Sequence, residues 1–245
     1  MKPSNGRYRA AWFVLIVLSV ALASVPLRTR QGIDGKVSMR FIPLYIKAIE
    51  FIDRDFHYRG LIREIMPQAM PEQEKVLALF RWVRENVRTD YPRTWRIIDD
   101  HILNIIIRRY GTSDQVADVF TTLCVYGRID AFWDKLSSDK DRKNLILSFV
   151  RIDGSWRVFD VFRGVYFKDQ QGRIATIDDI LSGKEIVSNE EKGLPEYEVD
   201  YRSYLINRKS VKLEKYLRVK RQMPWNRLTY EIKRLLFGEQ HLAIE

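Results

Sequence analysis

The segment that most constrains the fold is a pair of β-rich runs around a two-residue turn signal. Leu145–Ile152 and Trp156–Phe162 flank the dipeptide Asp153-Gly154. Asp-Gly readily adopts the positive φ values of a tight hairpin turn, so the two runs are predicted to pair antiparallel, with Ile152 opposite Ser155. Because side chains alternate along a strand, one face of this hairpin should carry positions 145, 147, 149, 151, 156, 158, 160 and 162.

The region before the hairpin is predicted to be mainly helical. Apolar residues recur at helical spacing over 43–56, 71–87, 95–109 and 113–124. Thr112-Ser113-Asp114-Gln115 has the form of a capping box, which places the start of the last of these helices. Helices followed by a small antiparallel sheet predict an α+β fold. Beyond the hairpin we expect a strand near 165–168, a short helix over 177–181, and two amphipathic helical stretches separated by Pro224.

The first thirty residues differ from the rest of the chain. Lys2, Arg7 and Arg9 precede the uncharged run Ala10–Leu27. This pattern predicts a transmembrane signal anchor and a single-pass protein of the bacterial inner membrane, with its soluble body in the periplasm. The alternative is secretion after signal cleavage near Ala23, because Ala21-Leu22-Ala23 has the small-x-small form of a cleavage site.

Four regions follow from these patterns. Residues 1–30 are the predicted anchor, 31–70 a helical lead-in, 71–170 the core, and 171–245 a lid or loop with a basic amphipathic helical extension. A hydrophobic content of 46% is sufficient for one core of this size.

Three sequence blocks resemble the transglutaminase-like domain, which has the papain-type cysteine protease fold. They are EKVLALFRWVRENVRTDYP at 74–92, GTSDQVADVFTTLCVYGRIDA at 111–131 and FVRIDGSWRVFD at 149–160. The family pattern is a helix with W-V, then G-x-C-D-x-x-A, then H-x-W-x-E-V-x-x-D-G-x-W-x-x-x-D. The resemblance covers about residues 70–165 and implies a helical layer against a small antiparallel sheet, with a Cys-His-Asp triad.

The reactive residues of that triad are replaced in this chain. The family Cys falls on Ser113, the His on Leu145 and the Asp on Asp160. Without a base at position 145, a serine hydroxyl is a poor nucleophile, so we expect no catalysis, no cofactor and no metal site. Cys124 is predicted to be a buried core thiol. His101 is interpreted as a polar-face or capping residue, and it is the candidate base for the alternative in which Ser113 is active.

The positive charge of the chain is concentrated near its end. Ten Lys and Arg stand against two Glu between 208 and 238, whereas the formal net charge of the whole chain is +10. The stretch is interpreted either as a helix packed on the domain with a solvated basic face, or as a lipid-facing helix. The lipid-facing candidates are Lys212, Lys215, Arg218, Arg221 and Arg227.

These features together predict a membrane-anchored, catalytically inactive binding or scaffolding module at the cell envelope, in a polysaccharide or envelope assembly complex. Its expected partners are an envelope protein, or a peptide or glycan held in a cleft, and not nucleic acid. The candidate cleft residues are Ser113, Asp114, Trp156 and Asp160. The alternatives are an active peptidase or acyltransferase that uses Ser113, and a membrane-surface protein that acts through its basic helix.

Overall fold

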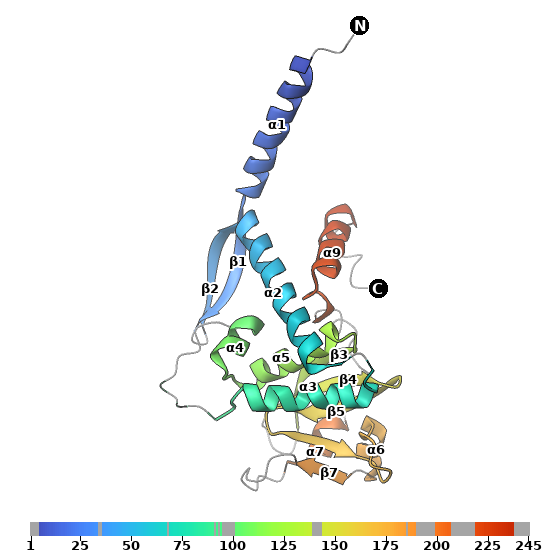
Figure 1. Ribbon diagram of the computed structural model, residues 1–245. Helices are drawn as coiled ribbons and strands as arrows, with labels where there is room; N and C mark the ends of the chain where they lie inside the picture. The colour runs from blue at the N-terminus through green and yellow to red at the C-terminus, as the bar shows by residue number, and fades with distance from the viewer. Residues whose placement is uncertain are drawn as a thin grey trace.

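Figure 1 shows a computed structural model of the chain, which describes residues 5–33, 36–67, 69–90, 92, 94, 101–138, 144–184, 186–189, 199–206 and 219–237. The helices are α1 (Asn5–Ala23), α2 (Leu44–Ile65), α3 (Glu72–Asn86), α4 (Ile102–Arg108), α5 (Ser113–Tyr126), α6 (Ile177–Ser182), α7 (Tyr201–Leu205) and α9 (Pro224–Phe237). The strands are β1 (Pro26–Ile33), β2 (Lys36–Pro43), β3 (Ala131–Ser137), β4 (Asn144–Ile152), β5 (Ser155–Asp160), β6 (Val165–Lys168) and β7 (Ile186–Asn189). The chain therefore has an α+β fold with small antiparallel sheets.

The larger sheet is a five-stranded meander in the order β3-β4-β5-β6-β7, and each neighbouring pair is antiparallel. The predicted register of the β4–β5 hairpin is confirmed, because Ile152 lies opposite Ser155 and Phe149 opposite Val158. Asp153 and Gly154 both have positive φ, 49° and 78°, as a tight hairpin turn requires. The outer strands β3 and β7 were not predicted.

One face of this sheet packs against α3 and α5 through aromatic rings. Phe159 of β5 contacts Phe80 of α3 and Phe120 of α5, with ring centroids 5.6 Å and 5.3 Å apart. Tyr166 of β6 joins the same group at 5.6 Å from Phe80. The rings of all three phenylalanines are excluded from solvent, so this cluster is the centre of the core.

The opposite face of the sheet is also covered. Phe132 of β3 stacks on Phe149 of β4 at 5.0 Å, and Trp156 meets Phe132 edge-on. Phe167 of β6 packs against Tyr201 of α7 at 5.0 Å. Because neighbouring residues of a strand point to opposite faces, Asp160 lies on this second face, away from α3 and α5.

Residues 26–33 and 36–43 form the antiparallel pair of β1 and β2, which the sequence did not predict. Pro26 pairs with Pro43, and the register continues to Ile33 opposite Lys36. Pro43 then occupies the N-cap position of α2, where its missing N–H costs no hydrogen bond. The predicted helix near 43–56 therefore exists, but it continues to Ile65.

The predicted membrane anchor over residues 1–30 is wrong. Within the part of the chain that the structure describes, no helix is both long enough and apolar enough to span a bilayer. α1 ends at Ala23 and the chain enters β1 at Pro26, so the uncharged run is helical only over Ala10–Ala23. That stretch is about 21 Å long at 1.5 Å per residue, shorter than a hydrocarbon core of roughly 30 Å.

The localisation inferred from that anchor is wrong for the same reason. Neither a single pass through the bacterial inner membrane nor a body held at the membrane by its N-terminal helix is supported. The alternative, secretion after signal cleavage near Ala23, stays a prediction.

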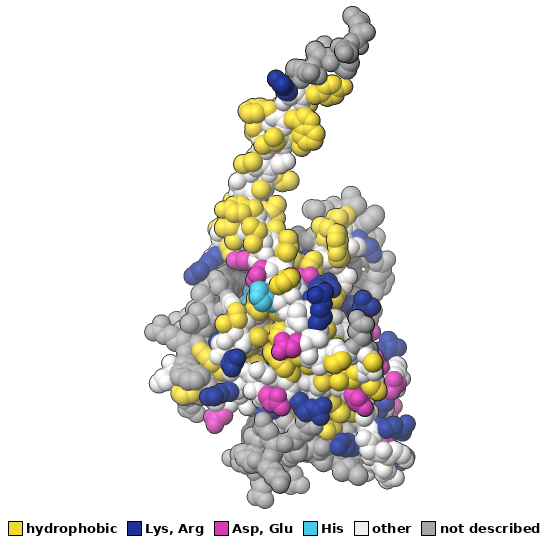
Figure 2. Space-filling model, viewed as in Figure 1, with side chains coloured by type: hydrophobic (Ala, Val, Ile, Leu, Met, Phe, Trp, Pro, Cys, Tyr) yellow, Lys and Arg dark blue, Asp and Glu magenta, His cyan; other side chains and the backbone are white. Residues whose placement is uncertain are grey.

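Large apolar side chains lie exposed on helices outside the core. Figure 2 shows them gathered over α1, the adjoining part of α2 and α9. Those on α2 and α9 are between 47% and 74% exposed: Tyr45, Ile49, Ile52, Phe56, Trp225, Leu228 and Ile232. The apolar surface of the chain is thus divided between a buried cluster around the sheet and exposed faces of the peripheral helices.

We predict that Phe159→Ala lowers the free energy of unfolding by about 3–5 kcal/mol, because the surrounding rings cannot fill the space it leaves. Denaturant unfolding measures this loss. Phe56→Ala is the matched control, since Phe56 is 73% exposed and its truncation should change stability by no more than about 0.5 kcal/mol. Equal losses for the two variants would contradict the central position of Phe159.

Candidate functional site

The start of α5 is built by a capping box, as the sequence predicted. Thr112 is the N-cap residue, and the side chain of Gln115 accepts a hydrogen bond from the Thr112 amide at 3.2 Å. Arg108 of α4 donates to the same Gln115 oxygen at 2.6 Å, which ties α4 to α5. Ser113 is therefore the first residue of the helix, half-buried beside its cap, in the position that the resemblance gives to a nucleophile.

Leu145 and Asp160 lie on the same face of the sheet. The register that places Ser148 opposite Phe159 sets Leu147 opposite Asp160 when it is extended by one residue. Leu145 is two residues further along β4 and is thus a diagonal neighbour of Asp160, as predicted. The side chain of Leu145 is buried, so this position carries an apolar group where the family pattern has its imidazole.

The carboxylate of Asp160 is completely buried and has three hydrogen bonds. The backbone N–H of Arg163 donates to Oδ1 at 3.0 Å, and the Arg163 guanidinium donates to Oδ2 at 2.9 Å. The Tyr201 hydroxyl donates to Oδ2 at 2.9 Å. Burial raises the pKa of Tyr201, and the neighbouring charge of Asp160 raises it further, so Tyr201 stays protonated and remains a donor.

The turn after Asp160 is held from the helical side as well. Arg84 of α3 donates to the carbonyl oxygens of Val161 and Phe162 at 3.2 Å and 2.7 Å. Gly164 has φ of 69°, and a Cβ there would lie 3.1 Å from Nε of Arg84. Glycine therefore meets both a backbone and a packing requirement in this turn.

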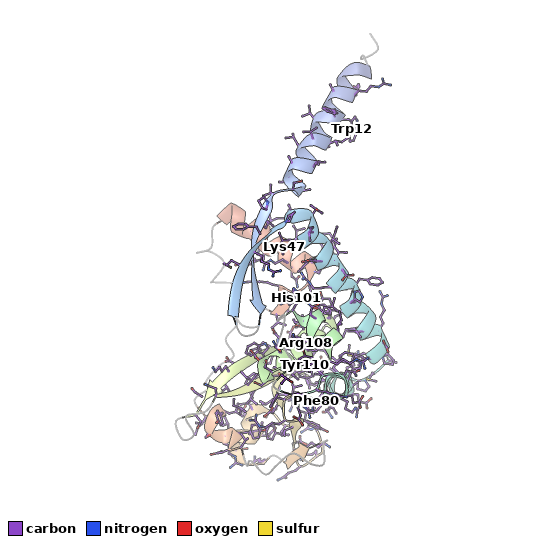
Figure 3. All side chains as sticks on the ribbon, turned by 90° about the vertical axis from the view of Figure 1, so that its left-hand side faces the viewer. Trp12, Lys47, Phe80, His101, Arg108 and Tyr110 are labelled. Atoms are coloured by element: carbon purple, nitrogen blue, oxygen red, sulfur yellow. The ribbon has the colours of Figure 1, made fainter. Side chains whose placement is uncertain are left out.

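Two of the three histidines lie in described parts of the chain, and neither is bonded to Ser113. His101 precedes α4, and its Nε2 accepts a hydrogen bond from Arg54 of α2 at 2.5 Å. Figure 3 shows His101 and Tyr110 at opposite ends of α4, with Tyr110 at the end nearer Phe80. His57 is exposed on α2 and contacts the Asp53 carbonyl, and His241 lies outside the described residues.

Cys124 lies inside α5 with no exposed surface, as predicted. Burial raises the pKa of its thiol well above the ordinary value, so the reactive thiolate does not form in the folded protein at neutral pH. Cys124 therefore belongs to the core.

The four candidate cleft residues are divided between separate parts of the structure. Ser113 and Asp114 are at the start of α5, where Asp114 is exposed and accepts a hydrogen bond from the Thr112 hydroxyl. Trp156 and Asp160 belong to the far face of the sheet, where Trp156 packs on Phe132. Among the described residues, no three acidic, histidine or cysteine side chains come together as a metal site.

A basic cavity of about 600 Å³ lies between α9 and the turn that follows α5. Of the predicted lipid-facing cations, Lys212, Lys215 and Arg218 lie outside the described residues, Arg227 is exposed on α9, and Arg221 lines this cavity. The cavity could not be predicted from sequence as a site, because its walls come from two distant segments, residues 125–130 and 220–233. The excess of cations in the second segment was visible in the sequence but did not indicate a cavity.

No protein-family model and no curated protein matches this chain. Among solved structures it is similar to a putative cysteine protease from Cytophaga hutchinsonii, with TM-score 0.38 and 16% identity, over 61% of this chain and 56% of that one. It is also similar to a putative protease from Parabacteroides distasonis, with TM-score 0.34 and 14% identity, over 56% of this chain and 36% of that one. The chain thus spans about half of the first neighbour and about a third of the second, and no activity is transferred from either.

We predict that Tyr201→Phe lowers the free energy of unfolding by about 1.5–3 kcal/mol, because it removes a donor from a buried carboxylate. Chemical denaturation provides the measurement. Tyr45→Phe is the matched control, since Tyr45 is exposed on α2 and should change stability by less than about 0.5 kcal/mol. A Tyr201→Phe variant as stable as this control would contradict the contact with Asp160.

We also predict that Cys124 resists alkylation by maleimide in the folded protein, including at pH values near 9, where an ordinary thiol is largely ionised. At that pH the thiol ionises only in the unfolded chain, because burial raises its pKa in the folded protein. The folded state is therefore favoured most below about pH 8.5, and this contribution to stability is lost as the pH rises. Mass spectrometry with and without denaturant measures the reaction. Rapid labelling of the native protein would show that the thiol is accessible.

Proposed function

We propose that this chain is a catalytically inactive, transglutaminase-like protein that acts by binding. The observation that carries the proposal is the buried Leu145 beside Asp160, where the family pattern has its histidine. An aliphatic side chain can neither accept a proton from a nucleophile nor return it to a leaving group. Position 145 therefore carries no side chain that can act as a general base.

The bonding of Asp160 supports the same proposal. In a triad the acid orients the imidazole through a hydrogen bond. Here three donors from Arg163 and Tyr201 occupy most of the roughly four lone-pair sites of the carboxylate. The acid has a structural role, in which it joins the turn after β5 to α7.

The rival function, a serine hydrolase or acyltransferase, needs a base for Ser113. His101 is the candidate in sequence, but its Nε2 lone pair already accepts from Arg54. His101 directly precedes α4, and residues 109–112 connect the end of α4 to Ser113. His101 and Tyr110 lie at opposite ends of α4 (Figure 3), a helix about 10 Å long at 1.5 Å per residue.

The binding partner we propose is a peptide or glycan, the class expected from the resemblance, or another protein for which the chain serves as a scaffold. Ser113, Asp114 and Trp156 are the candidate contacts that keep exposed surface, whereas Asp160 is buried and enclosed by its own partners. The envelope setting expected from the sequence is not part of this proposal.

A fluorophosphonate probe tests the absence of catalysis. We predict no labelling of the full-length chain at high protein concentration, and the same background for wild type and Ser113→Ala. Ser182→Ala is the matched control, because Ser182 is an exposed serine at the end of α6. A known serine hydrolase in the same reaction establishes that the probe is active.

Labelling that is lost in Ser113→Ala and retained in Ser182→Ala would overturn the proposal. In that case His101→Gln should be tested next, because loss of labelling there would identify the base. Mass spectrometry of proteolytic peptides would then locate the adduct.

A further inference from the structure

The cavity between α9 and the turn after α5 is distinct from the triad positions. None of its walls contains Ser113, Leu145 or Asp160. Its volume of about 600 Å³ lies within the range of small-molecule sites. The lining residues are Val125, Arg128, Asp130, Lys220, Arg221, Met223, Asn226, Thr229, Tyr230 and Lys233.

The charges around this cavity are strongly unequal. Among the lining residues that the structure describes, four side chains are cationic, namely Arg128, Lys220, Arg221 and Lys233, and Asp130 is the one carboxylate. Asp130 pairs with Lys220 at 3.3 Å and with Arg151, outside the lining, at 3.9 Å. A concave surface with walls of one charge concentrates the field, so this cavity favours an anion of more than one charge.

The segment that carries two of these cations is fixed to the body of the protein. Val219 is buried, and the backbone carbonyl of Gln222 accepts a hydrogen bond from the Tyr126 hydroxyl at 3.0 Å. The Lys220–Asp130 ion pair connects the same segment to the residues after α5. Lys220 and Arg221 are therefore positioned before any ligand arrives, which reduces the ordering cost of binding.

Arg221 is presented in a defined orientation. Its guanidinium lies over the ring of Tyr230, 3.7 Å from the centroid. The N–H groups of a guanidinium form a planar fork that matches two oxygens of a phosphate group. Among the cations of the cavity, Arg221 has the geometry best suited to recognise an oxyanion.

We propose that this cavity binds a phosphate-bearing ligand, with Arg221 and Lys233 as its main contacts. The excess of three positive charges among the lining side chains fits a phosphate monoester or a diphosphate better than a single carboxylate. The phosphate belongs either to a soluble small molecule or to a lipid headgroup. This site is independent of the proposed function, because it shares no residue with the triad positions.

Titration calorimetry of the full-length chain with sodium pyrophosphate, at constant ionic strength, tests the proposal. We expect saturable binding that weakens about tenfold or more in Arg221→Gln and Lys233→Gln. Arg221→Lys should bind with intermediate affinity, because it keeps the charge and loses the planar fork. Arg81→Gln is the matched control, since Arg81 is exposed on α3 away from the cavity, and its affinity should stay within about twofold of wild type.

Thermal unfolding of each variant separates loss of binding from loss of fold. An Arg221→Gln protein that unfolds like wild type but binds weakly supports the site. Absence of pyrophosphate binding at millimolar concentration in the wild type overturns the proposal. Equal weakening in Arg221→Gln and Arg81→Gln also overturns it, because binding would then depend on net charge alone.

Vesicle sedimentation distinguishes the two sources of phosphate. Binding to phosphatidylcholine vesicles that contain phosphatidic acid, displaced by pyrophosphate and lost in Arg221→Gln, assigns the site to a lipid headgroup. Pyrophosphate binding without such displaceable vesicle binding assigns it to a soluble phosphate compound. Vesicle binding that survives both pyrophosphate and Arg221→Gln belongs to the exposed apolar helices and does not count for the cavity.

Discussion

The packing of Phe159 between Phe80 and Phe120 determines much of the remaining structure. This contact joins β5 to α3 and α5, and all three rings are excluded from water. Because residues alternate along a strand, directing Phe159 toward the helices directs Asp160 toward the opposite face. A carboxylate placed there is buried and needs donors, and the rest of the fold supplies them.

Those donors come from two places in the chain. Arg163 is in the turn directly after β5, and Tyr201 is in α7, which covers the second face of the sheet. Tyr201 also packs on Phe167, so one side chain provides both apolar contact and a hydrogen bond. With Arg84 holding the same turn from α3, Asp160 connects two layers of the protein.

The features that were predictable from sequence are those with local causes. The Asp153-Gly154 turn, the capping box at Thr112 and the helix beginning at Pro224 each depend on a few adjacent residues. β3 was missed because Asp134 and Lys135 interrupt its apolar pattern, and its strand conformation depends on pairing with β4. The uncharged run near the N-terminus was misinterpreted because hydropathy does not show that the helix ends at Ala23. The basic cavity was missed because its two walls are about a hundred residues apart in sequence, although the cation excess in one of them was visible.

The order of strands in the larger sheet also bears on how the protein is made. Every strand from β3 to β7 pairs with its neighbour in sequence, so the pairings of this sheet are local in the chain and can form quickly. A chain that folds as it leaves the ribosome completes this sheet at Asn189, before Tyr201 emerges. The partner of Asp160 that lies 41 positions later is therefore the last to arrive. Until then the carboxylate of Asp160 stays exposed to water on the second face of the sheet, and the docking of α7 is the step that buries it.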